Sequence, residues 1–251
     1  MKKAIYVEGL SEMAFVYQML LTHFDMDWTQ VHISCVNLKN IETTPKPADY
    51  GAEDAPNQYL LRNVGNDESV SSMLLEGYDN LKKAGYDQVI GLRDVYSDHY
   101  KSLYQRSLEE KDIARFIADI RESLSDFMES EDMLHLHFAI MEVESWLLEI
   151  SKNNVLPQLD ANLTIEKIKD TLDVDLSGAL EYSIFHPAVK LSGILASVGL
   201  SYSKHWDDIK NIVFKLTKED FDELYQSCRS RSYSEFYQAI FDIADREYCE
   251  L

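Results

Sequence analysis

Acidic residues follow three apolar segments of this sequence, at positions where carboxylates could bind a metal or transfer protons. Glu8 comes directly after a short apolar segment, Asp94 and Asp98 follow a second one, and Glu142 and Glu144 end a third. In a parallel α/β sheet the carboxyl ends of the strands face one crevice, so these side chains are expected to converge there. Converging carboxylates repel one another unless a cation neutralises them.

The donor set predicts the kind of metal. Carboxylate oxygens without a His/Cys cluster favour Mg²⁺ or Mn²⁺ over zinc as the cofactor. Cys35, Cys228 and Cys249 are widely spaced and form no CxxC motif, so neither a structural zinc site nor a disulfide framework is expected. This cysteine usage favours a reducing cytoplasm. No apolar run reaches about 18 residues, so no membrane span is predicted.

The elements that must position these carboxylates follow an α/β pattern. Residues 3–7 predict a buried strand, Gly9 a tight turn, and residues 11–24 a helix with one apolar face. The apolar run 88–93 predicts an interior strand, and the alternation over 133–143 predicts a long strand that Glu142 closes.

The remaining segments complete this pattern. Strands are predicted over 31–36 and 59–64, a long loop over 37–57, and helices over 67–81, with Asp67 as cap, and over 112–128. Further helices are predicted over 164–173, 187–198, 205–216, 218–228 and 232–247. We therefore expect a mainly parallel sheet sandwiched by helices over residues 1–150, with a helical region over 151–251 packed on it.

The net charge of −20 argues against direct binding of nucleic acid, because an acidic protein repels phosphate backbones at long range. Such binding would require a local basic patch, divalent cations or a partner that supplies positive charge. The positive stretch is 186–218, with five lysines, two aspartates and a net charge of +3. Its ordinary meaning is a solvated helix face. If it folds over the crevice, Lys190 is a candidate for binding substrate phosphate.

Two motifs resemble those of a known family. Val7-Glu8-Gly9-Leu10-Ser11-Glu12 resembles the V-E-G-x-x-E opening of Toprim domains, the fold shared by topoisomerases, primases and OLD-type nucleases. Asp94-Val95-Tyr96-Ser97-Asp98 resembles the second, aspartate-bearing motif of that family. The spacing departs from the usual D-x-D pattern, because two extra residues separate the aspartates.

A closer resemblance, over most of the chain, is to a bacterial Toprim-like family linked to abortive infection and phage defence. Met141-Glu142-Val143-Glu144-Ser145 is similar to its H/M-E-x-E-[AS] motif, and Asp94-Val95-Tyr96 to its D-x-Y motif. The helical tail of that family carries a His-Pro near a lysine and a Tyr-x-Lys. Here these are His186-Pro187, which precede Lys190, and Tyr202-Ser203-Lys204.

The resemblance implies roles for the matched positions. Glu8 would be the general acid or base, or a ligand of a second metal, and Lys204 would meet substrate or transition-state charge. Glu12, Asp94 and Asp98 would bind Mg²⁺, and Glu142 or Glu144 would complete the metal shell. On a strand, Glu142 and Glu144 would share one face because they are two residues apart. If a helix begins at residue 144, Glu144 would instead be an amino-terminal helix charge.

Two functions of different classes follow from these observations. The first is a Mg²⁺-dependent nuclease or related phosphoryl-transfer enzyme, acting in phage defence. The second is a non-catalytic subunit that retains the fold and works through a protein partner such as an ATPase; the acidic charge and the loosened aspartate spacing favour it. The sequence leaves open a homo-oligomer and does not distinguish DNA, RNA, tRNA or a small phosphate ester as substrate.

Overall fold

The computed structural model of the protein describes residues 1–38, 41–95, 114–115, 117–120, 122 and 133–244. The amino-terminal elements are β1 (Lys2–Val7), α1 (Leu10–His23), β2 (Val31–Asn37), β3 (Asn57–Asn63), α2 (Asp67–Lys83), β4 (Gln88–Asp94) and β5 (Leu134–Ala139). The later helices are α5 (Val143–Ser151), α6 (Val155–Leu159), α7 (Ile165–Leu172), α8 (Pro187–Ala196), α9 (Trp206–Val213), α10 (Lys218–Ser227) and α11 (Arg231–Phe241).

The chain separates into two compact units, which are described one by one below. The first contains Met1–Asp94 and, further along, the strand residues up to Phe138. The second contains Val95 and the chain from Ala139 onward, including all helices from α5 to α11.

A five-stranded parallel sheet forms the first unit, with strand order β2-β3-β1-β4-β5. β1 pairs in parallel with both β3 and β4, and β2 pairs in parallel with β3. β5 also runs parallel to β4, because Val89 N donates to Met133 O and Val95 N to Ala139 O, with the same offset along both strands. This all-parallel arrangement is Rossmann-like and has β1, one of its most apolar strands, at the centre.

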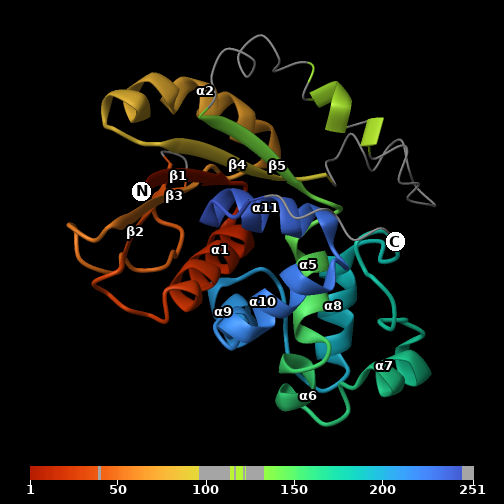
Figure 1. Ribbon diagram of the computed structural model, residues 1–251. Helices are drawn as coiled ribbons and strands as arrows, with labels where there is room; N and C mark the ends of the chain where they lie inside the picture. Colours follow the sequence, from red (N-terminus) through yellow and green to blue (C-terminus); the bar gives the residue numbers. More distant parts are fainter. Residues whose placement is uncertain (39–40, 96–113, 116, 121, 123–132, 245–251) are drawn as a thin grey trace. The chain divides into compact units, whose positions relative to one another are not determined.

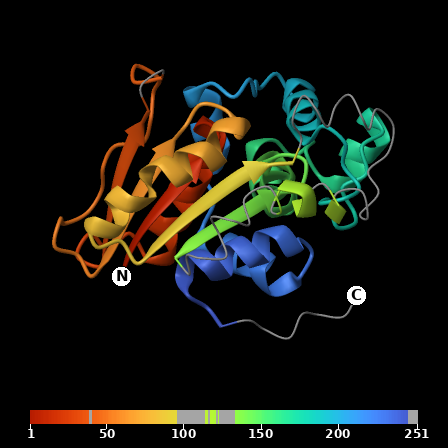
Figure 2. The same ribbon diagram turned by 90° about the horizontal axis from the view of Figure 1, so that it is seen from above.

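Helices cover both faces of the sheet. α2 packs on β1 and β4, whereas α1 packs against β3, and the two helices lie on opposite faces (Figure 1). Seen from above, α2 extends along the strands (Figure 2). Both faces of the central strands are therefore buried, and for this reason β1 and β4 are continuous apolar runs and not alternating ones.

The outer edge of β2 is covered by the loop that precedes β3. Ile33 and Tyr50 exchange two backbone hydrogen bonds as an isolated antiparallel bridge, with N–O distances of 2.8 and 2.9 Å. Asp49 accepts from Cys35 N at 2.8 Å, and Lys46 donates to Cys35 O. The predicted loop over 37–57 thus gives β2 hydrogen-bond partners on its free side.

The second unit is built around α5, all nine residues of which are buried. Trp146 is fully buried and packs edge-on against Tyr233, with ring centroids 5.5 Å apart, and stacks on Phe236. Its indole N–H donates to Ser232 Oγ at 3.0 Å. Because all of its residues are buried, α5 lies at the centre of the helical core of this unit.

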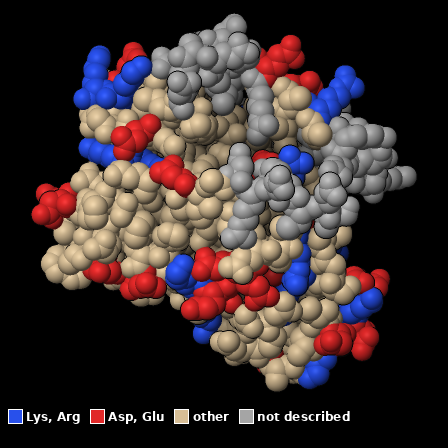
Figure 3. Space-filling view, in the orientation of Figure 1, with Lys and Arg blue, Asp and Glu red and all other residues tan. Residues whose placement is uncertain are grey.

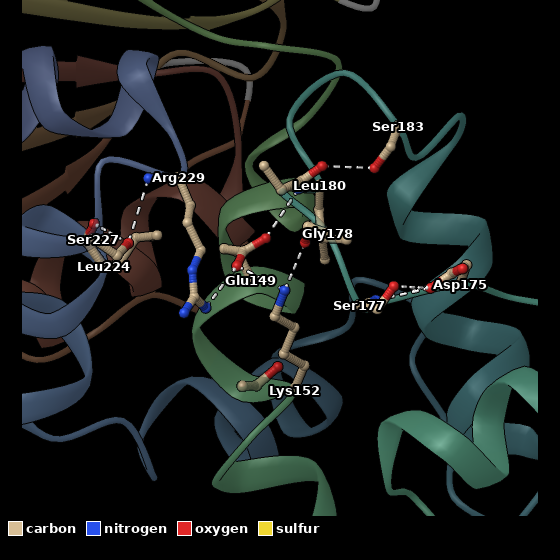
Figure 4. A network of polar contacts seen from close by, with 12 residues as sticks. Glu149, Lys152, Asp175, Ser177, Gly178, Leu180, Ser183, Leu224, Ser227 and Arg229 are labelled. Carbon is tan, nitrogen blue, oxygen red and sulfur yellow. Dashed lines mark hydrogen bonds and ion pairs between the residues drawn. The ribbon is translucent and has the colours of Figure 1, made fainter. Parts of the chain in front are cut away.

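A buried ion-pair network joins α5 to two loops of the second unit (Figure 4). The Lys152 ammonium lies 2.7 Å from Glu149 Oε1 and donates to Gly178 O at 2.8 Å. Glu149 Oε2 accepts from Leu180 N at 3.0 Å, and Arg229 donates to Glu149 Oε1 at 3.4 Å. The side chains of Glu149 and Lys152 are both 2% exposed, so two charges are held inside the unit by pairing.

Most predicted elements are present, with three corrections. The strand predicted over 133–143 ends at Ala139, because Met141 adopts a left-handed conformation (φ 65°) and α5 begins at Val143. The cap of α2 is Asn66 and not Asp67, since the Asn66 side chain accepts from Ser69 N. α6 was not predicted.

The predicted 112–128 helix lies largely outside the described residues. Cys35 is a buried free thiol. Within the described part of the chain, no helix has both the length and the apolar character needed to cross a membrane.

Candidate metal-binding carboxylates

The carboxyl ends of β1 and β4 bring two predicted residues together in the first unit. Glu8 follows the last residue of β1, and Asp94 is the last residue of β4. The strands are neighbours in register, with Val7 opposite Leu92. Asp94 N donates to Glu8 Oε2 at 3.4 Å, so the Glu8 carboxylate reaches over the end of β4.

The turn between β1 and α1 adds a third carboxylate. Gly9 is the N-cap of α1 in an extended conformation (φ −151°), and Glu12 lies in the first turn of the helix with 3% exposure. A Cβ atom on Gly9 would lie only 2.9 Å from Glu12 Oε2. The glycine therefore leaves room for this carboxylate, and the amino end of the helix dipole favours its negative charge.

Glu12 and Asp94 form a buried carboxylate pair at this edge. One oxygen of each lies within 4.8 Å of the other, and the residues are 3% and 4% exposed. Two buried carboxylates at this separation disfavour each other's charged form, and a bridging cation would relieve the repulsion. Oxygen-only donors fit Mg²⁺ or Mn²⁺ in their chemistry. Asp98, the fourth predicted ligand near this edge, lies outside the described residues.

In the second unit, the predicted residues Glu142 and Glu144 form a group around Lys204. Glu144 is fully buried; its Oε1 accepts from the Tyr202 hydroxyl at 2.8 Å, and its Oε2 lies 3.1 Å from the Lys204 ammonium. Glu142 Oε1 accepts from Lys204 at 3.3 Å, and its Oε2 from Ala188 N at 3.2 Å, in the first turn of α8. One lysine therefore neutralises part of the charge of two glutamates.

These positions correct the predicted relation between Glu142 and Glu144. They do not share one face of a strand: Glu142 is the N-cap of α5, and Glu144 is in its first turn. Both nevertheless reach Lys204, because Glu142 has an extended backbone (φ −145°, ψ 157°) and its side chain does not follow the spiral of the helix. The alternative that Glu144 is an amino-terminal helix charge describes its location correctly.

Three of the eight described non-glycine residues with positive φ angles lie at or next to this group. Met141, His186 and Lys204 all have positive φ angles, of 65°, 56° and 58°, although none is a glycine. Such conformations cost on the order of 1 kcal/mol or more each and are common at functional sites. Met141 directly precedes Glu142, and Lys204 is the cation of the group. His186 is the N-cap of α8, the helix whose Ala188 N donates to Glu142.

Lys190, the predicted phosphate-binding residue, is exposed on α8 and belongs to a different surface of the second unit. It lines a cavity of about 390 Å³ together with Asp173 and Asp175. Two acidic residues in the same lining do not favour a phosphate there. On the face drawn in Figure 3, acidic side chains are spread widely with basic ones among them, in keeping with the net charge of −20.

Sequence reasoning missed two contributors to the Lys204 group. Tyr202 was noted only as part of a Tyr-x-Lys motif, yet its hydroxyl is the hydrogen-bond donor to the fully buried Glu144. The second contributor is the Ala188 backbone amide, which donates to Glu142 and which no side chain in the sequence indicates. Pro187 could have indicated it, because proline is typical of the first turn of a helix, where backbone amides are unpaired.

Comparison with known proteins adds no family to this description: no family model, no curated protein and no solved structure matches the chain. A function for this protein therefore has to be inferred from its own residues.

Proposed function

We propose that the protein is a Mg²⁺-dependent phosphoryl-transfer enzyme of Toprim type, specifically a nuclease that acts in phage defence. The observation that carries the proposal is the pair of buried carboxylates, Glu12 and Asp94, with oxygens within 4.8 Å at the carboxyl edge of a parallel sheet. Glu8 lies beside them, and the crevice at this edge is where α/β proteins bind ligands. The order of the Toprim-like motifs supports the same reading.

Glu12 and Asp94 would hold the metal, because both offer buried carboxylate oxygens and no softer donor competes among the described residues around them. A bound divalent cation would supply charge stabilisation for a phosphodiester. Glu8 is half-buried and would accept a proton from the attacking water, since it is the more accessible of the three carboxylates. Lys204, with a side chain 41% exposed, would offset the charge that develops on the phosphate.

The sequence motifs also assign Glu142 or Glu144 to the metal shell. This stays a proposal, and Glu144 is the better candidate because its Oε2 is buried and receives no hydrogen bond from the described residues besides the ion pair with Lys204. Calorimetric titration with Mn²⁺ tests it: Glu144→Gln should weaken binding if the side chain is a ligand. Unchanged affinity would leave it as a partner of Tyr202 and Lys204 alone.

A nuclease screen with Mn²⁺ and Mg²⁺ on single- and double-stranded DNA, RNA and tRNA tests the activity. Glu8→Gln should remove turnover but keep metal binding, whereas Asp94→Asn should weaken both. Glu53→Gln, an exposed carboxylate of the same unit, is the matched control and should behave as wild type. Hydrolysis that persists in Glu8→Gln, or metal affinity that is unchanged in Asp94→Asn, would contradict the proposal.

The second candidate, a non-catalytic subunit that works through a partner such as an ATPase, has its own supporting observation. Lys204 already neutralises Glu142 and Glu144 by ion pairs, so these two carboxylates need no metal to be stable. A protein of this kind would show neither metal affinity nor hydrolysis alone. It would co-purify with the ATPase in stoichiometric amounts, which size-exclusion chromatography of the coexpressed pair can measure.

A further inference from the structure

A second cavity lies in the first unit and is lined by none of the candidate metal ligands. It has a volume of about 600 Å³ and runs along α2, from the Asn66 cap to Asn80, on the face of the sheet that carries Tyr6. This volume is within the usual range of small-molecule sites, about 300–1,000 Å³. The cavity is thus large enough for a ligand and not merely a packing defect.

A glycine in α2 leaves room for a tyrosine at the wall of this cavity. Gly77 faces Tyr6, and a Cβ atom in its place would lie 2.2 Å from the Tyr6 hydroxyl oxygen. Any larger residue would drive α2 off the sheet or push the tyrosine out of position. A helix-interior glycine costs roughly 1 kcal/mol of stability relative to alanine, so the close approach it permits is a specific feature of this face.

The polar end of the cavity is built from hydrogen-bond donors. Arg62 donates to the Tyr6 hydroxyl at 2.7 Å, and the Arg62 guanidinium lies 5.4 Å from the centre of the Tyr6 ring. The Tyr6 ring is fully buried, so it fixes the direction of the guanidinium. The Arg62 Nε–H is buried and has no acceptor in the described part of the chain, where the guanidinium also forms no ion pair. Burial raises the pKa of Tyr6, so its O–H remains a donor at neutral pH.

The other walls are of two kinds. Leu38, Ile41, Val64 and Met73 supply an apolar surface. Among the described lining residues Glu76 is acidic, and it acts on Tyr6 electrostatically with the opposite sign to Arg62. An occupant must therefore present an acceptor or an anion to Arg62 and Tyr6, and an apolar body to the remaining wall.

We propose that this cavity binds a small organic anion, a phosphate monoester or a carboxylate attached to an apolar or aromatic body, with its anionic group on Arg62. A guanidinium with unused donors suits either group through paired N–H···O bonds. The apolar wall distinguishes such a ligand from inorganic phosphate, which would gain nothing from it. The proposal goes beyond the proposed metal-dependent activity and does not depend on it.

The test is calorimetric binding in EDTA, so that no metal at the carboxylate edge can hold a phosphate. The probes are adenosine 5′-monophosphate, 3-phenylpropionate, adenosine and inorganic phosphate. We expect one of the two amphipathic anions, adenosine 5′-monophosphate or 3-phenylpropionate, to bind. Comparison of the two identifies whether a phosphate monoester or a carboxylate is preferred. Adenosine and inorganic phosphate should each bind at least tenfold more weakly, because each lacks one half of the recognised chemistry.

Two substitutions with opposite signs make the result specific. Arg62→Gln should weaken the anion tenfold or more, since hydrogen bonds to charged groups are lost. Glu76→Gln should tighten it severalfold, because a negative charge that faces the ligand is removed. Lys83→Gln, which removes one positive charge from the exposed end of α2, is the matched control and should change nothing. A structural role for Arg62 would not produce the tightening in Glu76→Gln.

Three results would overturn the proposal: no amphipathic anion binds, inorganic phosphate binds as tightly as the monoester, or Glu76→Gln fails to tighten binding. The last comparison remains decisive even if Arg62→Gln does not fold. Because the measurement contains no divalent metal, its failure is distinguishable from failure of the metal-dependent activity, which is assayed by turnover.

Discussion

Replacing Lys152 by methionine should destabilise the protein strongly. Its ammonium is 2.7 Å from Glu149 Oε1, and both side chains are 2% exposed. Lys152→Met fills nearly the same volume, so the loss comes from the charge and not from a cavity. Glu149 would keep its hydrogen bond from Leu180 N but remain as a buried carboxylate without its close cation. Breaking a buried pair in this way costs about 3–5 kcal/mol of the free energy of unfolding.

Arg229→Met is the matched control, because it removes a positive charge from the same oxygen of Glu149. The Arg229 side chain is 43% exposed and its nitrogen is 3.4 Å away, so solvent screens the interaction. We expect a loss below about 1 kcal/mol. The contrast between the two variants isolates burial as the cause, since the partner and the charge removed are the same.

A double-mutant cycle then measures the coupling directly. Glu149→Gln keeps an acceptor for Leu180 N and removes the negative charge. In the double variant with Lys152→Met, no charge is left buried, so the loss should be smaller than the sum of the two single losses by up to about 3 kcal/mol.

Urea unfolding followed by tryptophan fluorescence is the assay. Trp146 is fully buried in α5, one turn before Glu149, and reports the unfolding of this unit, whereas Trp28 is 61% exposed and should respond weakly. Equal losses for Lys152→Met and Arg229→Met, or strict additivity in the cycle, would refute the reasoning from burial.

Three further predictions rest on the surroundings of single residues. Burial raises the pKa of the Cys35 thiol to about 12, so iodoacetamide at pH 8 should label this cysteine only after unfolding, as measured by mass spectrometry of the peptide. Thr217→Ala should lower the free energy of unfolding by about 1 kcal/mol and Thr217→Ser should not, because the hydroxyl caps Asp220 N in a capping box; urea midpoints of the two variants decide this. Burial raises the pKa of Glu181 in the folded state above its usual 4.5, so the stability this group contributes is present below that value and lost as the pH rises through the folded pKa. The unfolding free energy of wild type minus that of Glu181→Gln should therefore fall between pH 4 and 7, and a flat difference would contradict the shift.

The strands and turns that hold Glu8 and Asp94 were predictable because their signals are local. β1 and β4 are short apolar runs, and Gly9 marks the turn between β1 and α1. Parallel pairing then requires only the general rule that such strands lie side by side with their carboxyl ends together. The contact between Glu8 and Asp94 follows from that rule and from no long-range information.

The end of β5 was not predictable in this way. The alternation of Leu134, Leu136, Phe138 and Ile140 continues past the last paired residue, so the pattern extends the strand. The chain instead turns at Met141, and nothing in a methionine signals a left-handed conformation. The same limit applies to Lys204, Tyr202 and Arg62, whose partners are 56 or more residues away in the sequence.

The loop that covers the outer edge of β2 also bears on how the protein behaves at high concentration. An open strand edge is a template on which a second chain can add its own strand, and proteins commonly block it with charged residues or a covering loop. Here Tyr50 occupies the backbone groups of Ile33, while Asp49 and Lys46 occupy those of Cys35 with a carboxylate and an ammonium. A loop without regular secondary structure in its described part thus blocks the edge of β2 on which a second chain could add a strand.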